Sequence, residues 1–518
     1  MGVAEVVVAG GARMLGLSFL QKGGTFVMNM LTLRRLPVHL SGVSLSLELV
    51  LSTTFIVREG LRLASLREEN LSEAISLRKL LNTAWISALV GILCTLAAAL
   101  CMAPRLYDTT AGDYAAFQTS LWLFCLSAAI EYLTEPLYIV ANASLNFPLR
   151  VQAQGWGFFT KAVVQVVLVV VFDMGMIAFG FSQVAFAIVH GLVYLRHYYL
   201  QLGAPSFPLT SILELLPSPR VPLNLPLLTL WATLFLQSCL KYLLTEGDKL
   251  ILSAFESYQS MGAYSVAFNI GSLAPRLLFL PIEDASKAMF SKLLAVPVST
   301  SSKAEARTWL LRVLQGMTYV GLIFVCFGTN YARTALYLLA GYDKAQGDTP
   351  VVLAMYFVYV YFLGLNGICE AFVHAVGDKT ALQRLNSYLV LCFVATTASA
   401  VGLLHVAQLG IVGIVLANCI NMTLRIGYCL WYMVGFFQDT TIANLFLETL
   451  PPWQVSIGFV AAMGLTFVSE GVARGPSLAP HALHVGVGGS LFLVVLVLVW
   501  RFDPSFVQLL LRKKTKMA

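Results

Sequence analysis

Charged residues are scarce in this chain of 518 residues: they make up 11% of it, against 58% hydrophobic residues and a mean hydropathy of +0.79. A soluble domain carries about 25% charged and about 45–50% apolar residues. A soluble protein this apolar would lack the polar surface it needs, which excludes a cytosolic enzyme, a disordered chain and a secreted disulfide-rich protein. The composition therefore predicts an all-α polytopic membrane protein.

Motifs for catalysis and for metal binding are also missing. The nine cysteines are scattered singly, with neither metal-ligand spacing nor a disulfide framework. There is no Gly-rich phosphate loop, no His-Glu-x-x-His and no nucleophile elbow, and no ATP-binding domain. Glu246-Gly247-Asp248 resembles the acidic motif of a membrane glycosyltransferase, a minor alternative because no large extramembrane domain accompanies it. The sequence predicts a transporter-like protein that is not an enzyme and has no cofactor and no metal.

Long apolar runs are what the chain has in abundance. A helix needs about 20 apolar residues to cross a bilayer. About fourteen segments meet this length, and they are expected near 14–33, 42–64, 80–103, 114–141, 146–172, 174–200, 226–253, 258–283, 309–331, 349–375, 382–404, 409–435, 453–470 and 482–500.

The lysines and arginines are distributed unevenly over the connections between these segments. The formal charge is +7, and most of the 33 basic residues fall on the side that holds both chain ends. Cytoplasmic loops carry an excess of Lys and Arg, so both termini are predicted to be cytoplasmic. The basic excess is thus a topology signal, and no nucleic-acid partner is expected.

A proline-rich connection over 202–225 divides the predicted helices into six before it and eight after it. Transporters are often built from repeated halves with their sites at the interface between the halves. We therefore expect an N-terminal six-helix lobe (1–201), a cytoplasmic linker (202–225), a C-terminal six-helix lobe (226–435), and two further helices with a basic tail (436–518). The alternative is that 202–225 is an ordinary loop.

Several ionisable residues lie inside the predicted spans, where a charge is costly unless it faces protein or water. Some cations share a helix face with polar residues, as Asn269 does with Arg276 and as Asn418 and Asn421 do with Arg425. Such faces suit a central cavity that holds an anionic group. The alternative is that these charges form interhelical ion pairs that lock the bundle. The cations are Lys22, Arg58, Lys161, Lys241, Lys249, Arg276 and Arg425, and the clearest anions are Glu48, Glu59, Glu131, Glu135, Glu246, Asp248 and Glu370.

Several short motifs follow one another in order from the first predicted helix to about residue 430. They are Ser52-Thr53-Thr54-Phe55 with Arg58-Glu59 and Arg62, Glu131 with Glu135-Pro136, Leu244 to Lys249, Gly262-Ala263-Tyr264, Gly271-Ser272-Leu273, Pro281-Ile282-Glu283, Asn366-Gly367 with Glu370-Ala371-Phe372, and Asn418 with Asn421-Met422 and Arg425. These motifs specifically resemble the Rft family, eukaryotic endoplasmic-reticulum proteins proposed to translocate dolichol-diphosphate-linked oligosaccharide. This family belongs to the multidrug/oligosaccharidyl-lipid/polysaccharide exporter superfamily.

The resemblance implies two six-helix lobes around a central cavity, two C-terminal helices, and a pentamannosyl-type oligosaccharide on dolichol diphosphate as substrate. The protein would sit in the endoplasmic-reticulum membrane as a flippase or scramblase for N-glycosylation, in contact with membrane lipid and with enzymes of that pathway. Two alternatives stay open: a non-transporting accessory or lipid-binding protein, and an ion-coupled small-solute antiporter. The last five residues also fit a Lys-x-Lys-x-x retrieval signal.

Under this interpretation the residues fall into three predicted roles. The diphosphate would be bound by Arg58, Lys241, Arg276 and Arg425. A second set of residues, called the second tier, would line the cavity. Three carboxylates would form gating ion pairs or couple transport to an ion. The second tier is Lys22, Asn29, Lys161, Asn269, Asn366 and Asn421, and the carboxylates are Glu131, Glu135 and Glu370.

Overall fold

The computed structural model describes residues 23–24, 26–66, 73–102, 114–144, 146–204, 207–294, 299–438 and 441–511. All regular secondary structure in these ranges is helical, which confirms the predicted all-α class. Among the described residues, ten helices are long and apolar enough to cross a membrane, and the bent pair Val38–Ser52 and Ile56–Ser65 makes eleven. The predicted count of fourteen is not confirmed, and the first predicted span and the C-terminal retrieval signal lie partly or wholly outside the described ranges.

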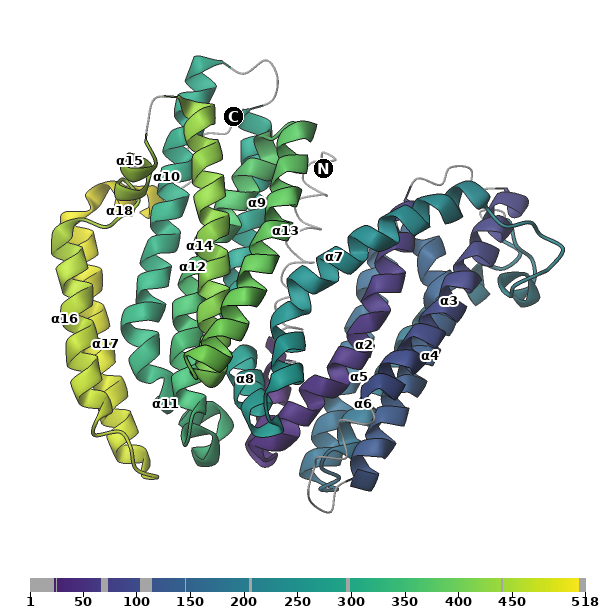
Figure 1. The fold of residues 1–518 in the computed structure, drawn as a ribbon, viewed down its shortest axis with the longest axis horizontal. Helices are drawn as coiled ribbons and strands as arrows, with labels where there is room; N and C mark the ends of the chain where they lie inside the picture. The colour runs from purple at the N-terminus through teal and green to yellow at the C-terminus, as the bar shows by residue number, and fades with distance from the viewer. Residues whose placement is uncertain are drawn as a thin grey trace. The chain divides into compact units, whose positions relative to one another are not determined.

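The chain folds into two compact units, the first ending at Gly262 and the second beginning at Ala263. In the first unit α2, α3 and α4 pack side by side, and α6 lies against both α4 and α5 (Figure 1). Its elements are α2 (Val38–Ser65), α3 (Ala74–Met102), α4 (Tyr114–Ala143), α5 (Phe147–Val170), α6 (Ile177–Gln201), the 3-10 turn η2 (Ile212–Leu215), α7 (Leu225–Phe255) and the first part of α8 (Tyr258–Gly271).

Two glycines allow the start of α2 to cross the start of α8 at backbone contact. A Cβ added to Gly42 would lie 1.9 Å from the Tyr258 carbonyl oxygen, and one added to Gly262 would lie 1.9 Å from the Val38 oxygen. Small residues at helix crossings in membranes permit this close approach. A side chain at either position would push the two helices apart.

The connection between α6 and α7 is fastened to the start of α3. Asn82 Nδ2 donates to the carbonyl oxygens of Ser218 (2.7 Å) and Val221 (2.8 Å), and Trp85 Nε1 donates to Leu215 (2.9 Å). Arg78 also forms an ion pair with Glu214 of η2. These bonds lead the chain into α7, which packs against α2 and so belongs to the first compact unit. The division into lobes at 202–225 stays a prediction.

The second unit is built around α12, which packs against α9, α10 and α14. Large apolar side chains such as Phe290, Leu310, Val360 and Phe372 are fully buried at its centre. Its elements after α8 are the π-helical turn η3 (Pro275–Phe279), α9 (Leu280–Leu293), α10 (Thr300–Ile323), the π-helical turn η4 (Phe324–Gly328), α11 (Thr329–Ala340), the 3-10 turn η5 (Tyr342–Ala345), α12 (Thr349–Val376), α13 (Lys379–Val401), the π-helical turn η6 (Gly402–Val406), α14 (Gly410–Phe437), α15 (Ile442–Leu447), α16 (Trp453–Glu470), α17 (Leu478–Phe502) and α18 (Pro504–Leu511).

The two C-terminal helices α16 and α17 are attached to this unit by polar contacts. Asn330 Nδ2 of α11 donates to the Thr466 hydroxyl of α16 at 2.8 Å, and the His484 ring of α17 stacks on Tyr331 with centroids 3.9 Å apart. His484 Nε2 also lies 3.2 Å from the Asn330 carbonyl oxygen. Hydropathy alone shows these helices as two apolar segments, whereas the contacts make them part of the second unit.

Candidate substrate-binding charges

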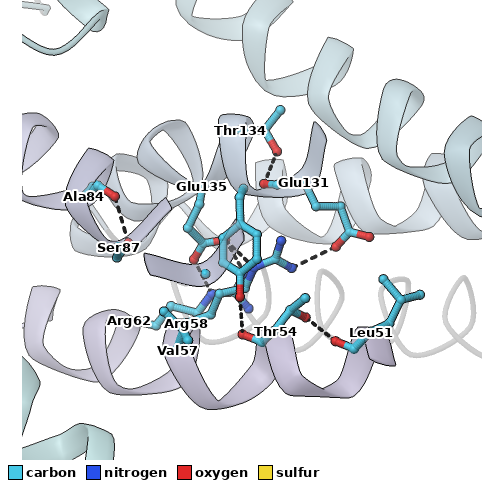
Figure 2. Close-up of polar contacts among 12 residues, drawn as sticks. Leu51, Thr54, Val57, Arg58, Arg62, Ala84, Ser87, Glu131, Thr134 and Glu135 are labelled. Carbon is cyan, nitrogen blue, oxygen red and sulfur yellow. Dashed lines mark hydrogen bonds and ion pairs between the residues drawn. The ribbon is translucent and has the colours of Figure 1, made fainter. Parts of the chain in front are cut away.

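The first charge cluster lies between α2 and α4 in the first unit (Figure 2). Arg58 and Arg62 are four residues apart on α2, and Glu131 and Glu135 are four apart on α4, so each pair occupies one face of its helix. Arg58 Nη1 lies 2.8 Å from Glu131 Oε2, and its Nε lies 3.4 Å from Glu135 Oε2. Arg62 meets Glu135 with Nε and Nη2, both at 2.7 Å.

Both arginines of this cluster also lie over aromatic rings. The guanidinium of Arg58 lies 4.4 Å from the centroid of Tyr132, and that of Arg62 lies 3.8 Å from the centroid of Tyr138. Such cation–π contacts strengthen in desolvated surroundings. Glu135 is almost completely buried, at 2% exposure. Two positive and two negative charges therefore cancel inside the helix bundle.

A bend in α2 precedes these arginines. The hydroxyls of Ser52 and Thr54 donate to the carbonyl oxygens of Leu49 and Leu51, a pattern that bends helices. The segments Val38–Ser52 and Ile56–Ser65 meet at 41°. The Tyr132 hydroxyl of α4 donates to the Thr54 carbonyl oxygen at 3.3 Å. Ser52 and Thr54 of the motif Ser52-Thr53-Thr54-Phe55 thus shape the backbone just before Arg58.

The second charge cluster lies between α12 and α14 in the second unit. Arg425 Nε and Nη2 meet the two carboxylate oxygens of Glu370 at 2.6 and 2.7 Å. Glu283 of α9 approaches the same part of α12, because a Cβ on Gly367 would lie 2.9 Å from its Oε2. Asn366 is buried beside Gly367, and its Oδ1 has no hydrogen-bond partner among the described residues. Here Arg425 is paired with Glu370, and a second carboxylate, Glu283, faces the same part of α12.

Arg276 differs from the other arginines of the predicted site. It lies in the π-helical turn η3, is exposed, and its guanidinium lies 5.3 Å from the ring centroid of Phe268. No carboxylate lies within ion-pair distance of it in the part of the chain that the structure describes. π-helical turns are frequent at functional sites. Arg276 therefore keeps its donors available for an anion.

The other predicted site residues are placed as follows. Asn29, Lys161 and Asn421 are half-buried, on the helical segment 26–35, on α5 and on α14. Asn269 on α8 is also half-buried and donates to the carbonyl oxygen of Ser265. Lys22 and the side chain of Lys241 lie outside the described parts of the chain. Their predicted roles stay predictions.

Sequence reasoning missed two residues of these clusters. Arg62 entered as part of a family motif and was given no role at the site, although its position four residues after Arg58 is the helical spacing that places both on one face. Glu283 entered only as part of a family motif, and no local signal brings it to α12. In the described ranges no group of three or more His, Cys, Asp or Glu side chains is placed to hold a metal ion.

The comparisons with known proteins decide the family. The family model described as Rft protein matches residues 10–513. This chain belongs to the Rft protein family. The predicted resemblance is thereby confirmed over nearly the whole length of the chain.

Curated relatives of this Rft protein are similar over most of their length. The Man(5)GlcNAc(2)-PP-dolichol translocation protein RFT1 of Xenopus tropicalis is 29% identical over 490 residues, which cover 91% of this chain and 90% of the relative. The protein of the same name from Mus musculus is 29% identical over 495 residues, covering 90% and 88%.

Solved structures show the fold. The lipid II flippase MurJ in an inward closed conformation matches with a TM-score of 0.65 at 12% identity, covering 95% of this chain and 99% of that one. A multidrug resistance MATE family transporter of the MOP superfamily, inward-facing, matches with a TM-score of 0.61 at 14% identity, covering 82% and 96%. This Rft protein is a multi-pass membrane protein with a transporter fold of the MurJ and MATE type.

Proposed function

We propose that this Rft protein translocates a dolichol-diphosphate-linked oligosaccharide, of the pentamannosyl type, from the cytosolic to the lumenal leaflet of the endoplasmic reticulum. The names of its relatives support this substrate, and the MurJ-type fold supports lipid movement. The placement of both termini in the cytoplasm and a contribution to N-glycosylation belong to the same proposal.

The observation that carries the proposal is the contrast between paired and unpaired arginines in membrane-spanning segments. Charges there are costly and mark substrate paths unless they are paired. Arg58 and Arg425 are held by Glu131 and Glu370. Exposed Arg276 has no carboxylate within ion-pair distance in the described ranges, so its guanidinium would meet the diphosphate first.

The paired arginines would bind by exchanging partners. A diphosphate offers the same kind of oxygen acceptors as a carboxylate and can replace it at Arg425 or Arg58. Arg58 Nη2 is buried without a hydrogen-bond partner among the described residues. This nitrogen can therefore donate a hydrogen bond to the diphosphate. Glu131, Glu135 and Glu370 would then act as gates that are released when the substrate binds. Lys241 and the second-tier residues would support the glycan and the diphosphate.

Reconstitution tests the proposal. The purified chain in phosphatidylcholine vesicles is expected to accelerate transbilayer movement of the lipid-linked oligosaccharide relative to empty vesicles. Arg276→Gln is expected to slow this movement by about tenfold or more, because a charge-assisted hydrogen bond contributes about 1.5–3 kcal/mol. Arg474→Gln, which removes an exposed arginine after α16, is the matched control and is expected to leave it unchanged.

The reconstitution results distinguish translocation from an accessory, lipid-binding role. No acceleration over empty vesicles would overturn translocation, and retained binding of the lipid in that case would favour the accessory, lipid-binding role. Equal effects of Arg276→Gln and Arg474→Gln would remove Arg276 from the site.

A further inference from the structure

A groove with several polar side chains in its lining runs along the first turns of α13 in the second unit. Its volume is about 530 Å³, within the range of small-ligand sites. The groove takes Tyr428 from α14, and its other polar lining comes from α13: Thr380, Gln383, Arg384, Ser387 and Tyr388. None of these residues belongs to the two charge clusters, so the groove is a separate feature of the unit.

The spacing of the polar residues places them on one side of the helix. Thr380, Arg384 and Ser387 follow i, i+4 and i+7, and all three are exposed. At 1.5 Å per residue they extend over roughly 10 Å, from the beginning of a helix that is otherwise apolar enough to span a membrane. A polar face directed at lipid tails would be costly. The groove therefore suits a polar ligand at the depth of lipid headgroups.

Arg384 is the charged group of the groove, and it is available. No carboxylate lies within ion-pair distance of it in the described ranges. The nearest carboxylate along the helix, Asp378, is occupied as a helix cap, because it accepts hydrogen bonds from the Ala381 N–H (2.7 Å) and the Thr380 hydroxyl (2.9 Å). A guanidinium with free donors in this position matches the geometry of phosphate oxygens.

Aromatic rings and hydroxyls complete the lining. Tyr388 and Tyr428 stack with centroids 4.7 Å apart, and the Tyr388 hydroxyl donates to the Leu424 carbonyl oxygen, which fixes the ring. Sugar rings pack their C–H faces on aromatic rings, while their hydroxyls exchange hydrogen bonds with side chains such as Gln383 and Ser387. A phosphate-binding cation beside aromatic and hydrogen-bonding groups matches one chemical class, a sugar joined to phosphate.

We propose that this groove binds the glycosyl-phosphate part of the lipid-linked oligosaccharide, as a docking site beside the Arg425–Glu370 pair. The proposal rests on the proposed function and adds a second place of contact with the same substrate. Tyr428 follows Arg425 by three residues on α14, so the groove and the pair occupy neighbouring turns of one helix. A phosphate held at Arg384 would be near the ion pair that must open.

Binding to the full chain in nanodiscs tests this docking site. The probe is a fluorescent short-chain analogue of the dolichyl diphosphate oligosaccharide in phosphatidylcholine. Arg384→Gln is expected to weaken its binding by about tenfold or more, and Arg384→Lys is expected to restore part of the affinity. Tyr428→Ala is expected to weaken it as well, whereas Tyr428→Phe keeps the ring and the affinity. Arg474→Gln is the matched control and is expected to bind normally.

Three results separate this inference from the proposed function. Unchanged binding by Arg384→Gln, with movement of the lipid intact, would overturn the groove and leave translocation standing. Arg384-dependent binding without transbilayer movement would support the groove while translocation fails. Equal competition by phosphatidylinositol and by the unlabelled analogue would show a general phospholipid contact and would overturn the groove as a substrate site.

Discussion

The buried charges of the two clusters are neutralised in different ways. In the first unit, Arg58 and Arg62 of α2 face Glu131 and Glu135 of α4, two charges against two, with hydrogen bonds and aromatic rings around them. In the second unit Arg425 forms an ion pair with Glu370, and a second carboxylate from α9 lies near the same helix. The first cluster joins two arginines to two carboxylates, whereas the second has one ion pair between an arginine and a carboxylate.

This difference indicates that the two units contribute differently to stability and to anion binding. Removing one partner from a balanced network with a nearly fully buried carboxylate leaves an uncompensated charge, so its arginines exchange partners less readily than an arginine without a carboxylate partner. The two proposed binding arginines without an ion-pair partner in the described ranges, Arg276 and Arg384, both lie in the second unit. Binding of an anionic lipid headgroup is therefore expected to depend more on the second unit, and structural stability more on the first cluster.

The largest expected effect is the loss of Arg62. Arg62→Met leaves the buried Glu135 carboxylate with only the longer contact to Arg58 at 3.4 Å. Removing one partner of a buried ion pair costs about 3–5 kcal/mol. We expect a decrease of this size in the free energy of unfolding, measured by denaturant titration in mixed micelles. Arg307→Met breaks a more exposed pair with Glu448 and should cost no more than about 1 kcal/mol. Similar losses in the two variants would contradict the comparison.

A smaller effect is expected from the pair in the second unit. Glu370→Gln removes the charge opposite Arg425, and the Glu370 side chain is 13% exposed against 3% for Glu135. Because this carboxylate is less completely buried, we expect a loss of about 1.5–3 kcal/mol in the same titration. Glu448→Gln is the matched control at an exposed carboxylate. A loss larger than that of Arg62→Met would reverse the ranking of the two clusters.

The smallest effect is expected at the surface pair of the first unit. Hydrogen bonds, first that from the Thr210 N–H, together with Arg78 hold the pKa of Glu214 below its usual range. A carboxylate with a lowered folded-state pKa stabilises the fold above its unfolded pKa of about 4.3, and this contribution is lost as the pH falls through the folded value. It should stay below about 1 kcal/mol, since the pair is solvent-accessible.

Thermal unfolding between pH 6 and pH 3 measures this contribution. Glu214→Gln should remove part of the pH dependence and leave the midpoint at pH 3 close to that of the parent chain. An unchanged pH profile in Glu214→Gln would show that the fastening of the linker to α3 rests on Asn82 and Trp85 alone.

Much of the fold followed from the sequence because hydropathy and helical period are local. Segments such as 349–375 and 409–435 correspond closely to α12 and α14. The short motifs also sufficed to predict the Rft family. The division into units did not follow, because the packing of α7 on α2 depends on contacts between distant segments rather than on composition.

The sequence by itself determined that this protein is a membrane protein and that it is helical, and it predicted which ionisable residues lie inside its spans. Only the tertiary structure decided which of those charges are neutralised. Arg58 meets Glu131 across 73 residues of chain, and Arg425 meets Glu370 across 55. The physical reason is that an ion pair needs two side chains within a few ångströms, and this distance is set by how helices pack, which no local pattern encodes.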